Sequence, residues 1–228
     1  MAQPHFSPEL FEFLRELAEN NNRDWFQANK SRYEDHVRDP MLQLISDFGG
    51  PLRKISRSFM ADPRKSGGSL FRIYRDTRFS KNKTPYKTNV AAYFKHKQAK
   101  DVHAPGFYLS LSPGEIFAGT GIWHPDSPTL KKIREAIVDQ PVAWKRCIGG
   151  KAFKSTFELG GESLKRGPKG FDPEHPLIED LKRKDFVGIT TFEEADALAP
   201  DFLDRYAAAC RAGAPLTRFL TRALELDW

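Results

Sequence analysis

A short basic run, RIYRDTRFSKNKTPYKTN at residues 72–89, holds the densest group of side chains able to bind a charged ligand. It contains three arginines and three lysines but a single acid, Asp76. Arginine presents a planar fork of donors that fits carboxylates and phosphates, and lysine adds a mobile ammonium group. We therefore interpret the run as a clamp for an anion. The candidate ligand-binding residues are Arg72, Arg75, Asp76, Arg78, Lys83, Tyr86 and Lys87.

Asp76 is the residue that decides how much positive charge the run leaves free. If the run begins as an extended strand, Asp76 shares a face with Arg72 and Arg78, because strand side chains alternate. One carboxylate can orient one guanidinium in a bidentate pair, which leaves the other arginines for an external anion. A structural Arg–Asp network that locks the strand to the helices is the alternative, and the two are compatible. Arginines around Asp76 should depress its pKa and make it a poor general base.

The basic character of the chain is local. Residues Arg64 to Lys100 hold eleven Lys or Arg and one acid, whereas the other residues hold 25 bases and 29 acids. A confined basic patch concentrates nearby anions, including phosphates. A solvated face that only keeps the protein in solution is the plainer explanation of such a patch.

Other chemistries leave no pattern in the sequence. The six histidines lack metal-site spacing, and the two cysteines, Cys147 and Cys210, fit neither a disulfide scaffold nor a zinc site. There is no phosphate-binding GxxxxGK[ST] loop and no GxSxG motif. His103 and His124 lie beside expected strands, where a structural role is the simpler interpretation. We expect no metal and no cofactor.

Helices are expected to form the N-terminal third. Proline after Ser7 and apolar residues at Leu10, Phe13, Leu14 and Leu17 predict the first helix. A second is expected over residues 25–33 and a third over residues 41–48. The Gly49-Gly50-Pro51 triplet is expected to interrupt the third helix before residues 52–59 resume it.

Strands are expected in the middle of the chain. The segments 70–75, 89–94, 106–111 and 115–123 are rich in β-forming residues, and the last two flank a Ser-Pro-Gly turn. They predict an antiparallel sheet of at least four strands. Within it, Gly119 and Gly121 predict a bulge or a close approach of two backbones.

The C-terminal third returns to helices. Ser127 and Pro128 predict a helix start, residues 186–192 a short strand, and residues 202–210 and 216–224 two closing helices. Strands grouped between helical runs indicate an α+β fold. We expect a single domain over residues 1–228, with a helical N-terminal third, a central, mainly antiparallel sheet and C-terminal helices.

The basic run also resembles the signature of a known protein family. Its residues follow the pattern RxxRDxRFxx[DN]KxxY from Arg72 to Tyr86, which is similar to an uncharacterised, mostly bacterial domain-of-unknown-function family. The segments Trp25-Phe26, Gly119-x-Gly121-x-Trp123 and PKGFDPEHP at residues 168–176 resemble other parts of that family. The resemblance covers nearly the whole chain and implies a single domain, but it brings no activity, substrate or cofactor.

Three functions remain open. The first is a binding domain for a phosphorylated or otherwise anionic ligand, such as a nucleotide, a nucleic acid or a phosphometabolite. The second is a metal-independent enzyme acting on an anionic substrate, and the third is a structural or protein-interaction domain whose Arg–Asp motif packs internally. No apolar run is long enough for a membrane span and no signal peptide is visible, so we expect a cytoplasmic protein with no membrane partner.

Overall fold

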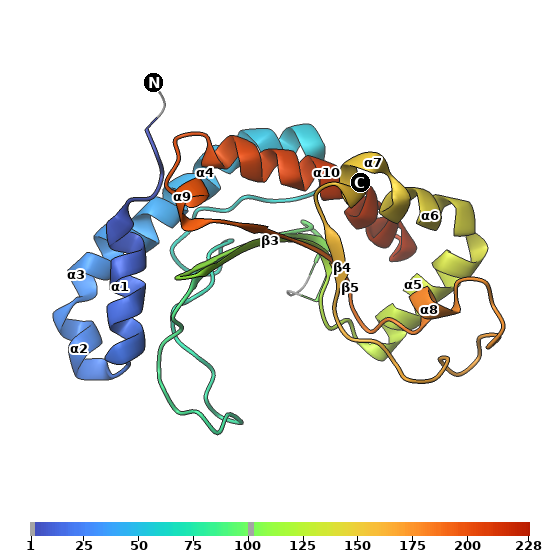
Figure 1. Ribbon diagram of the computed structural model, residues 1–228, viewed down its shortest axis with the longest axis horizontal. Coiled ribbons are helices and arrows are strands. Elements are labelled where there is room, and N and C mark those ends of the chain that lie inside the picture. Colours follow the sequence, from blue (N-terminus) through green and yellow to red (C-terminus); the bar gives the residue numbers. More distant parts are fainter. Residues whose placement is uncertain (1–2, 100–102) are drawn as a thin grey trace.

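The computed structural model describes residues 3–99 and 103–228, and it begins with a group of packed helices (Figure 1). Apolar residues at helical spacing are buried on one face of the first helix, as the sequence predicts. Asn22 then starts the second helix, since its side chain accepts a hydrogen bond from the backbone N–H of Trp25 at 2.9 Å. The group comprises α1 (Pro8–Glu19), α2 (Arg23–Ala28), α3 (Lys30–Tyr33), the π-helical turn η1 (Glu34–Arg38) and α4 (Asp39–Ile55).

Three boundaries in this helical group differ from the expectation. One is the end of α4, which stops at Ile55, so the helix expected over residues 52–59 does not reach Phe59, which instead bridges to His96. The second expected helix is divided at Asn29, which ends α2 and precedes α3. The expected break at Gly49-Gly50-Pro51 is wrong, because α4 continues through all three residues. Pro51 removes one helical hydrogen bond, but Phe48 before it and Leu52 after it are both buried in the same core, which holds the two halves in line.

A five-stranded antiparallel sheet follows, with the strand order β1-β2-β3-β5-β4. The α+β class and the central antiparallel sheet are thereby confirmed, while the short strand β4 was not expected. The strands are β1 (Val90–Lys95), β2 (Gly106–Ser112), β3 (Glu115–Ile122), β4 (Glu158–Gly160) and β5 (Phe186–Phe192).

The strand expected over residues 70–75 does not form, and this expectation is wrong. Its start does lie beside β1, where the N–H of Phe71 donates to Ala91 O at 2.9 Å and Leu70 forms a single bridge with Ala92. The segment then leaves the sheet, because Lys87 N–H bonds to Ile73 O at 2.7 Å. The chain therefore pairs with its own returning half instead of continuing along β1.

The C-terminal helices close the fold, with two corrections. The start of the helix after β3 is capped by Asp126, which accepts from Thr129 N–H at 2.9 Å, so Ser127 is already helical. The two expected closing helices form one, since α10 runs through Pro215. The helices are α5 (Ser127–Asp139), α6 (Pro141–Gly149), α7 (Lys151–Lys154), α8 (Ile178–Leu181), α9 (Glu194–Ala197) and α10 (Phe202–Ala223).

Helices α4 and α10 cover one face of the arched sheet, as Figure 1 shows. Alternation along the strands sends Phe107 and Leu109 into the buried core beneath these helices. Helix α10 comes very close to β3, because a Cβ added to Gly213 would lie 2.6 Å from Thr120 Cγ2. The opposite, concave face of the sheet carries Tyr108 and Phe117, which are only partly buried.

Buried apolar residues form two clusters that meet at the sheet. The larger one joins the N-terminal helices to β1 and β2, and the smaller one lies among α5, α6 and α10. Phe192 packs against both clusters. That residues 1–228 form one domain stays a prediction. Among the helices of residues 3–99 and 103–228, none combines the length and apolar composition that crossing a bilayer requires.

Candidate functional site

Residues 72–88, here called the basic hairpin, form an irregular loop that projects from the edge of the sheet (Figure 1). Its two halves are joined by a bridge between Tyr74 and Tyr86 and by a hydrogen bond from Arg75 N–H to Pro85 O at 2.9 Å. Proline at 85 can accept but not donate in such a pairing, so it suits a short ladder and not a long one. The basic hairpin thus has a defined base and an exposed tip.

Tyr86 fastens the basic hairpin to the N-terminal helices. Its side chain is 2% exposed and its ring stacks on Phe26 with centroids 4.1 Å apart. The side-chain amide of Asn21 accepts from Tyr86 N–H and donates to Tyr86 O, both at 3.0 Å. Tyr86 was predicted as a ligand-binding residue; the structure places its ring in the core, where it positions the cations around it.

Asp76 forms the bidentate pair that the sequence analysis expects. Its two carboxylate oxygens accept from Arg78 Nε at 3.0 Å and from Arg78 Nη2 at 2.7 Å. These hydrogen bonds, with the charges of Arg78 and Arg72, lower the pKa of Asp76 to about 2. The carboxylate is therefore ionised at neutral pH and is committed to one arginine.

Two further cations of the basic hairpin contact neutral oxygen atoms. Lys83 Nζ donates to Thr77 O at 2.8 Å, and Arg75 Nη1 donates to the Thr84 hydroxyl. Neither contact neutralises charge, so both groups keep their positive charge and most of their donors. They stiffen the tip of the hairpin while leaving it cationic.

Arg72 and Lys87 form no ion pair with a carboxylate in the part of the chain that the structure describes, although the charge of Arg72 contributes to the lowered pKa of Asp76. Arg72 is exposed, whereas Lys87 is half-buried with its Nζ 5.0 Å from the centroid of the Phe71 ring. Burial is the main cause that lowers the pKa of Lys87, and the charge of Arg72 adds to it. Two cations are thus held near each other at the base of the basic hairpin.

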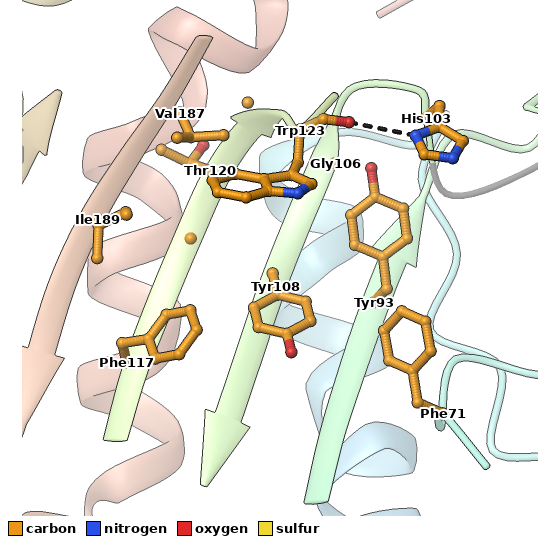
Figure 2. A pocket seen from close by; sticks show the side chains of 12 residues that line it. Phe71, Tyr93, His103, Gly106, Tyr108, Phe117, Thr120, Trp123, Val187 and Ile189 are labelled. Atoms are coloured by element: carbon orange, nitrogen blue, oxygen red, sulfur yellow. Dashed lines mark hydrogen bonds between the residues drawn. The ribbon is translucent and has the colours of Figure 1, made fainter. Parts of the chain in front are cut away.

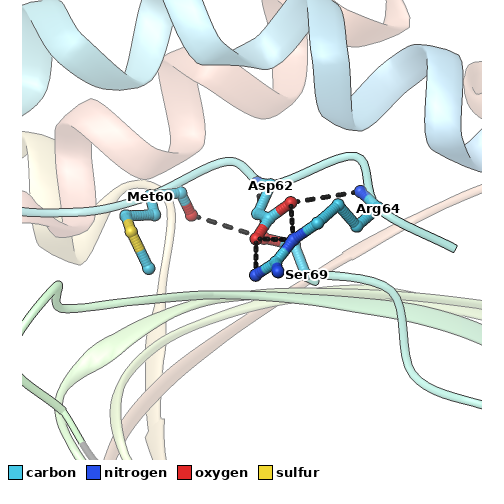
Figure 3. A network of polar contacts seen from close by, with 4 residues as sticks. All are labelled: Met60, Asp62, Arg64 and Ser69. Atoms are coloured by element: carbon cyan, nitrogen blue, oxygen red, sulfur yellow. Dashed lines mark hydrogen bonds and ion pairs between the residues drawn. The ribbon is translucent and has the colours of Figure 1, made fainter. Parts of the chain in front are cut away.

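In the loop before the basic hairpin, one cation, Arg64, is paired with a carboxylate of the protein, Asp62. Asp62 accepts from Arg64 Nε at 2.9 Å and from Arg64 Nη2 at 2.6 Å, and its backbone N–H donates to Ser69 Oγ at 3.0 Å (Figure 3). This network fixes the loop that leads into Leu70. Lys100, the last residue of the predicted basic segment, lies outside the described residues.

Next to the base of the basic hairpin, the concave face of the sheet holds a cavity of about 350 Å³. Rings from separate parts of the chain surround it, as Figure 2 shows. Phe71 contacts Tyr108 with ring centroids 6.0 Å apart, and Tyr108 contacts Phe117 at 5.5 Å. Trp123, immediately after β3, is 49% exposed and forms another side of the cavity.

Glycines on β2 and β3 create the room for this cavity. Strand register places Gly119 opposite Tyr108 and Gly121 opposite Gly106, so β3 carries no side chain at two successive positions of the concave face and β2 carries none at Gly106. Gly121 has φ +113°, and a Cβ there would lie 2.0 Å from Phe186 O. The close backbone approach predicted for the Gly119–Gly121 pair is thus confirmed at Gly121.

The polar groups of the cavity are largely engaged within the protein. Tyr93 donates its hydroxyl to Ala104 O, and Thr120 Oγ1 contacts Gly213 O at 3.2 Å on the opposite face. His103 Nδ1 lies 3.3 Å from Trp123 O. The cavity is therefore an aromatic space with few free hydrogen-bonding groups.

His124 has a structural partner beside the cavity. The fully buried carboxylate of Asp185 accepts from His124 N–H at 2.7 Å and from Glu162 N–H at 2.9 Å, and it lies 3.1 Å from His124 Nδ1. His124 has φ +47°, an uncommon value for a residue with a side chain, and the hydrogen bonds to Asp185 hold it there. Asp185 thus ties the end of β3 to the segment after β4.

The structure brings some of the predicted site residues together and adds others. Arg72 and Lys87 lie near each other, Asp76 and Arg78 pair, and Tyr86 anchors the hairpin. The cavity is not predicted by any motif in the sequence. One feature of the sequence does point to it. Side chains alternate along β2 and β3, and this alternation places the large rings of Tyr108 and Phe117 on the face opposite the core.

Comparison with known proteins adds a family but no activity. A comparison with curated proteins gave no match. Residues 9–219, most of the chain and all of the site described above, match the family described as "Conserved hypothetical protein (DUF2461)". The chain therefore belongs to this family of conserved hypothetical proteins.

Proposed function

We propose that the chain binds a phosphorylated or otherwise anionic ligand at the basic hairpin. One observation carries the proposal: the single acid of the hairpin is committed to Arg78, while Arg72 and Lys87 have no carboxylate partner among the described residues. Hydrogen bonds between such cations and an anion are stronger than those between neutral groups. Nucleotides, nucleic acids and phosphorylated metabolites all carry the required charge.

The state of Lys87 supports this proposal. A half-buried ammonium loses hydration, and its lowered pKa records that the charged form is disfavoured in the free protein. An anion placed beside Lys87 and Arg72 offsets both the lost hydration and the repulsion between the two cations. The site is therefore prepared for a negative charge that the protein itself does not supply.

The two alternatives account for less of the geometry. As a catalytic base, Asp76 has a pKa of about 2 and would rarely accept a proton at neutral pH. Internal packing explains the roles of Tyr86 and Arg75, but it assigns none to the exposed Arg72. We also place the protein in the cytoplasm as part of this proposal, since both cysteines are free and buried.

The test is isothermal titration calorimetry of the full chain, which measures its affinity for inorganic pyrophosphate and for ATP. The double variant Arg72→Ala/Lys87→Met should bind at least about ten-fold more weakly, because each charge-assisted hydrogen bond contributes about 1.5–3 kcal/mol. The matched control is Arg146→Ala/Lys151→Met, which removes the same charges from exposed residues of α6 and α7. It should bind as the wild type does.

Equal weakening by both double variants would show that only net charge attracts the anion, and the proposed site would be wrong. The proposal would also be contradicted if the wild type bound neither pyrophosphate nor ATP. Activity screens on the wild type and on Asp76→Asn then separate a binding domain from an enzyme. Turnover that Asp76→Asn abolishes, with ligand affinity unchanged, would favour the enzyme.

A further inference from the structure

The aromatic cavity is linked to the two cations at the base of the basic hairpin through one aromatic residue. Phe71 is the shared element, because its ring lines the cavity and Lys87 Nζ lies 5.0 Å from the centroid of that ring. We propose that this site takes an organic anion whose apolar aromatic ring enters the cavity while its phosphate or carboxylate reaches Lys87 and Arg72. The inference rests on the proposed function and adds the chemical class of the ligand.

The shape and lining of the cavity point to a ring. Tyr108 on β2 lies between Phe117 on β3 and Phe71, which precedes the basic hairpin, and the indole of Trp123 lies on another side of the same space (Figure 2). About half of the Trp123 side chain is exposed, so a large apolar surface remains in contact with water. Aromatic pairs in offset or edge-to-face contact gain about 0.5–1.5 kcal/mol beyond the burial of their area.

The scarcity of free polar groups indicates that the ring is apolar. The Tyr108 hydroxyl interacts with the side chains of Ser110 and Asn89, and the Tyr93 hydroxyl donates to Ala104 O. A nucleobase carries donors and acceptors around its edge, and each one buried without a partner costs about 1–3 kcal/mol. An unsubstituted aromatic ring avoids this cost, so we expect it to be preferred over a base.

The position of the charge matches this ligand. Lys87 is half-buried, and its ammonium lies 5.0 Å from the ring centroid of Phe71, a residue that lines the cavity. Arg72 is close enough to Lys87 for its charge to lower the pKa of that ammonium. An anionic group attached directly to a ring is the simplest chemistry that spans from the aromatic lining to these two cations.

The experiment is isothermal titration of the full chain with 1-naphthyl phosphate, 1-naphthol, inorganic phosphate and AMP. A carboxylate probe, 1-naphthoate, distinguishes the two kinds of anionic group. The wild type should bind 1-naphthyl phosphate at least about ten-fold more tightly than 1-naphthol, inorganic phosphate or AMP, a difference of about 1.4 kcal/mol. Equal affinity for AMP and 1-naphthyl phosphate would overturn the preference for an apolar ring.

Gly119→Leu is the variant that tests the cavity. A Cβ at Gly119 has Tyr108 Cβ at 3.5 Å as its nearest neighbour, which is an ordinary contact. Because Gly119 lines the cavity, the rest of a leucine side chain would occupy part of that space. The same substitution at Gly149, where nothing lies within 4 Å of a Cβ, is the matched control. Gly119→Leu should weaken 1-naphthyl phosphate at least about ten-fold and leave inorganic phosphate unchanged, while Gly149→Leu changes neither.

The outcomes separate this inference from the proposed function. If Gly119→Leu binds 1-naphthyl phosphate as tightly as the wild type, the ring lies elsewhere and the inference is wrong, although anion binding at Lys87 can stand. If Lys87→Met leaves the affinity for every phosphate unchanged, the proposed function is wrong and the anionic part of the inference falls with it. A single-stranded oligonucleotide that binds more tightly than 1-naphthyl phosphate, unaffected by Gly119→Leu, would indicate nucleic acid instead.

A second variant keeps the test valid if Gly119→Leu does not fold. Trp123→Ala removes a half-exposed ring that follows β3, so the sheet itself is left intact. It should weaken 1-naphthyl phosphate and 1-naphthol by the same factor and leave inorganic phosphate unchanged. Unchanged affinity for 1-naphthyl phosphate in this variant would overturn the inference.

Discussion

Tyr86 offers the sharpest test of how the basic hairpin is positioned. Replacing it with alanine removes a ring that is 2% exposed and that stacks on Phe26. The lost burial is worth about 1.5–3 kcal/mol and the stack about 0.5–1.5 kcal/mol, and a cavity remains. We expect Tyr86→Ala to lower the free energy of unfolding by about 3–5 kcal/mol.

The measurement is urea denaturation at 25 °C, with Phe79→Ala as the control. Phe79 is an aromatic residue of the same hairpin, but it is 96% exposed, so its removal should change the free energy of unfolding by less than about 0.5 kcal/mol. Tyr86→Phe keeps the ring and should stay close to the wild type. Equal midpoints for Tyr86→Ala and Phe79→Ala would show that the ring of Tyr86 does not anchor the hairpin, and the reasoning would fail.

Three further predictions concern charged groups. Asp185→Ala should lower the free energy of unfolding, measured by urea denaturation, by about 2–4 kcal/mol, because it leaves two backbone N–H groups without an acceptor. The control Asp172→Ala removes one exposed acceptor and should lower it by less than about 0.5 kcal/mol. Similar losses for both variants would contradict the role given to Asp185. The carboxyl carbon of Asp76 should titrate near pH 2 when it is followed by NMR. Because the folded pKa of Asp76 is depressed, its pair with Arg78 stabilises the fold above about pH 4, and this stabilisation is lost as the pH falls toward 2. A titration midpoint near pH 4 would exclude the pair. Lys87→Met should leave the unfolding midpoint unchanged or raise it, since burial disfavours the charged ammonium, and a clear loss of stability would assign Lys87 a structural role.

Local patterns in the sequence were sufficient for most of the secondary structure. The apolar spacing around Leu10 and Leu14 predicts α1, and the turn before Glu115 predicts the hairpin of β2 and β3. The errors arise where tertiary contacts outweigh local preference. Pro51 and Pro215 both lie inside continuous helices, because buried neighbours on both sides hold those helices together.

The candidate site was only half visible in the sequence. Its cations, including Arg72 and Lys87, lie within one short run of the chain, so local composition is enough to reveal them. The cavity is assembled from residues that only strand register brings together, such as Tyr108 on β2 and Phe117 on β3. The burial of Tyr86 likewise depends on Phe26, sixty positions earlier, and no local pattern encodes that contact.

Crystals of the full chain soaked with tungstate, an anion that anomalous scattering locates directly, give the most direct test of the proposed anion site. We expect an anomalous peak within hydrogen-bonding distance of Lys87 and Arg72, and no such peak in crystals of Arg72→Ala/Lys87→Met. Peaks confined to other surfaces of the wild type, with these two side chains unoccupied at a tungstate concentration that saturates the protein in solution, would contradict the proposal.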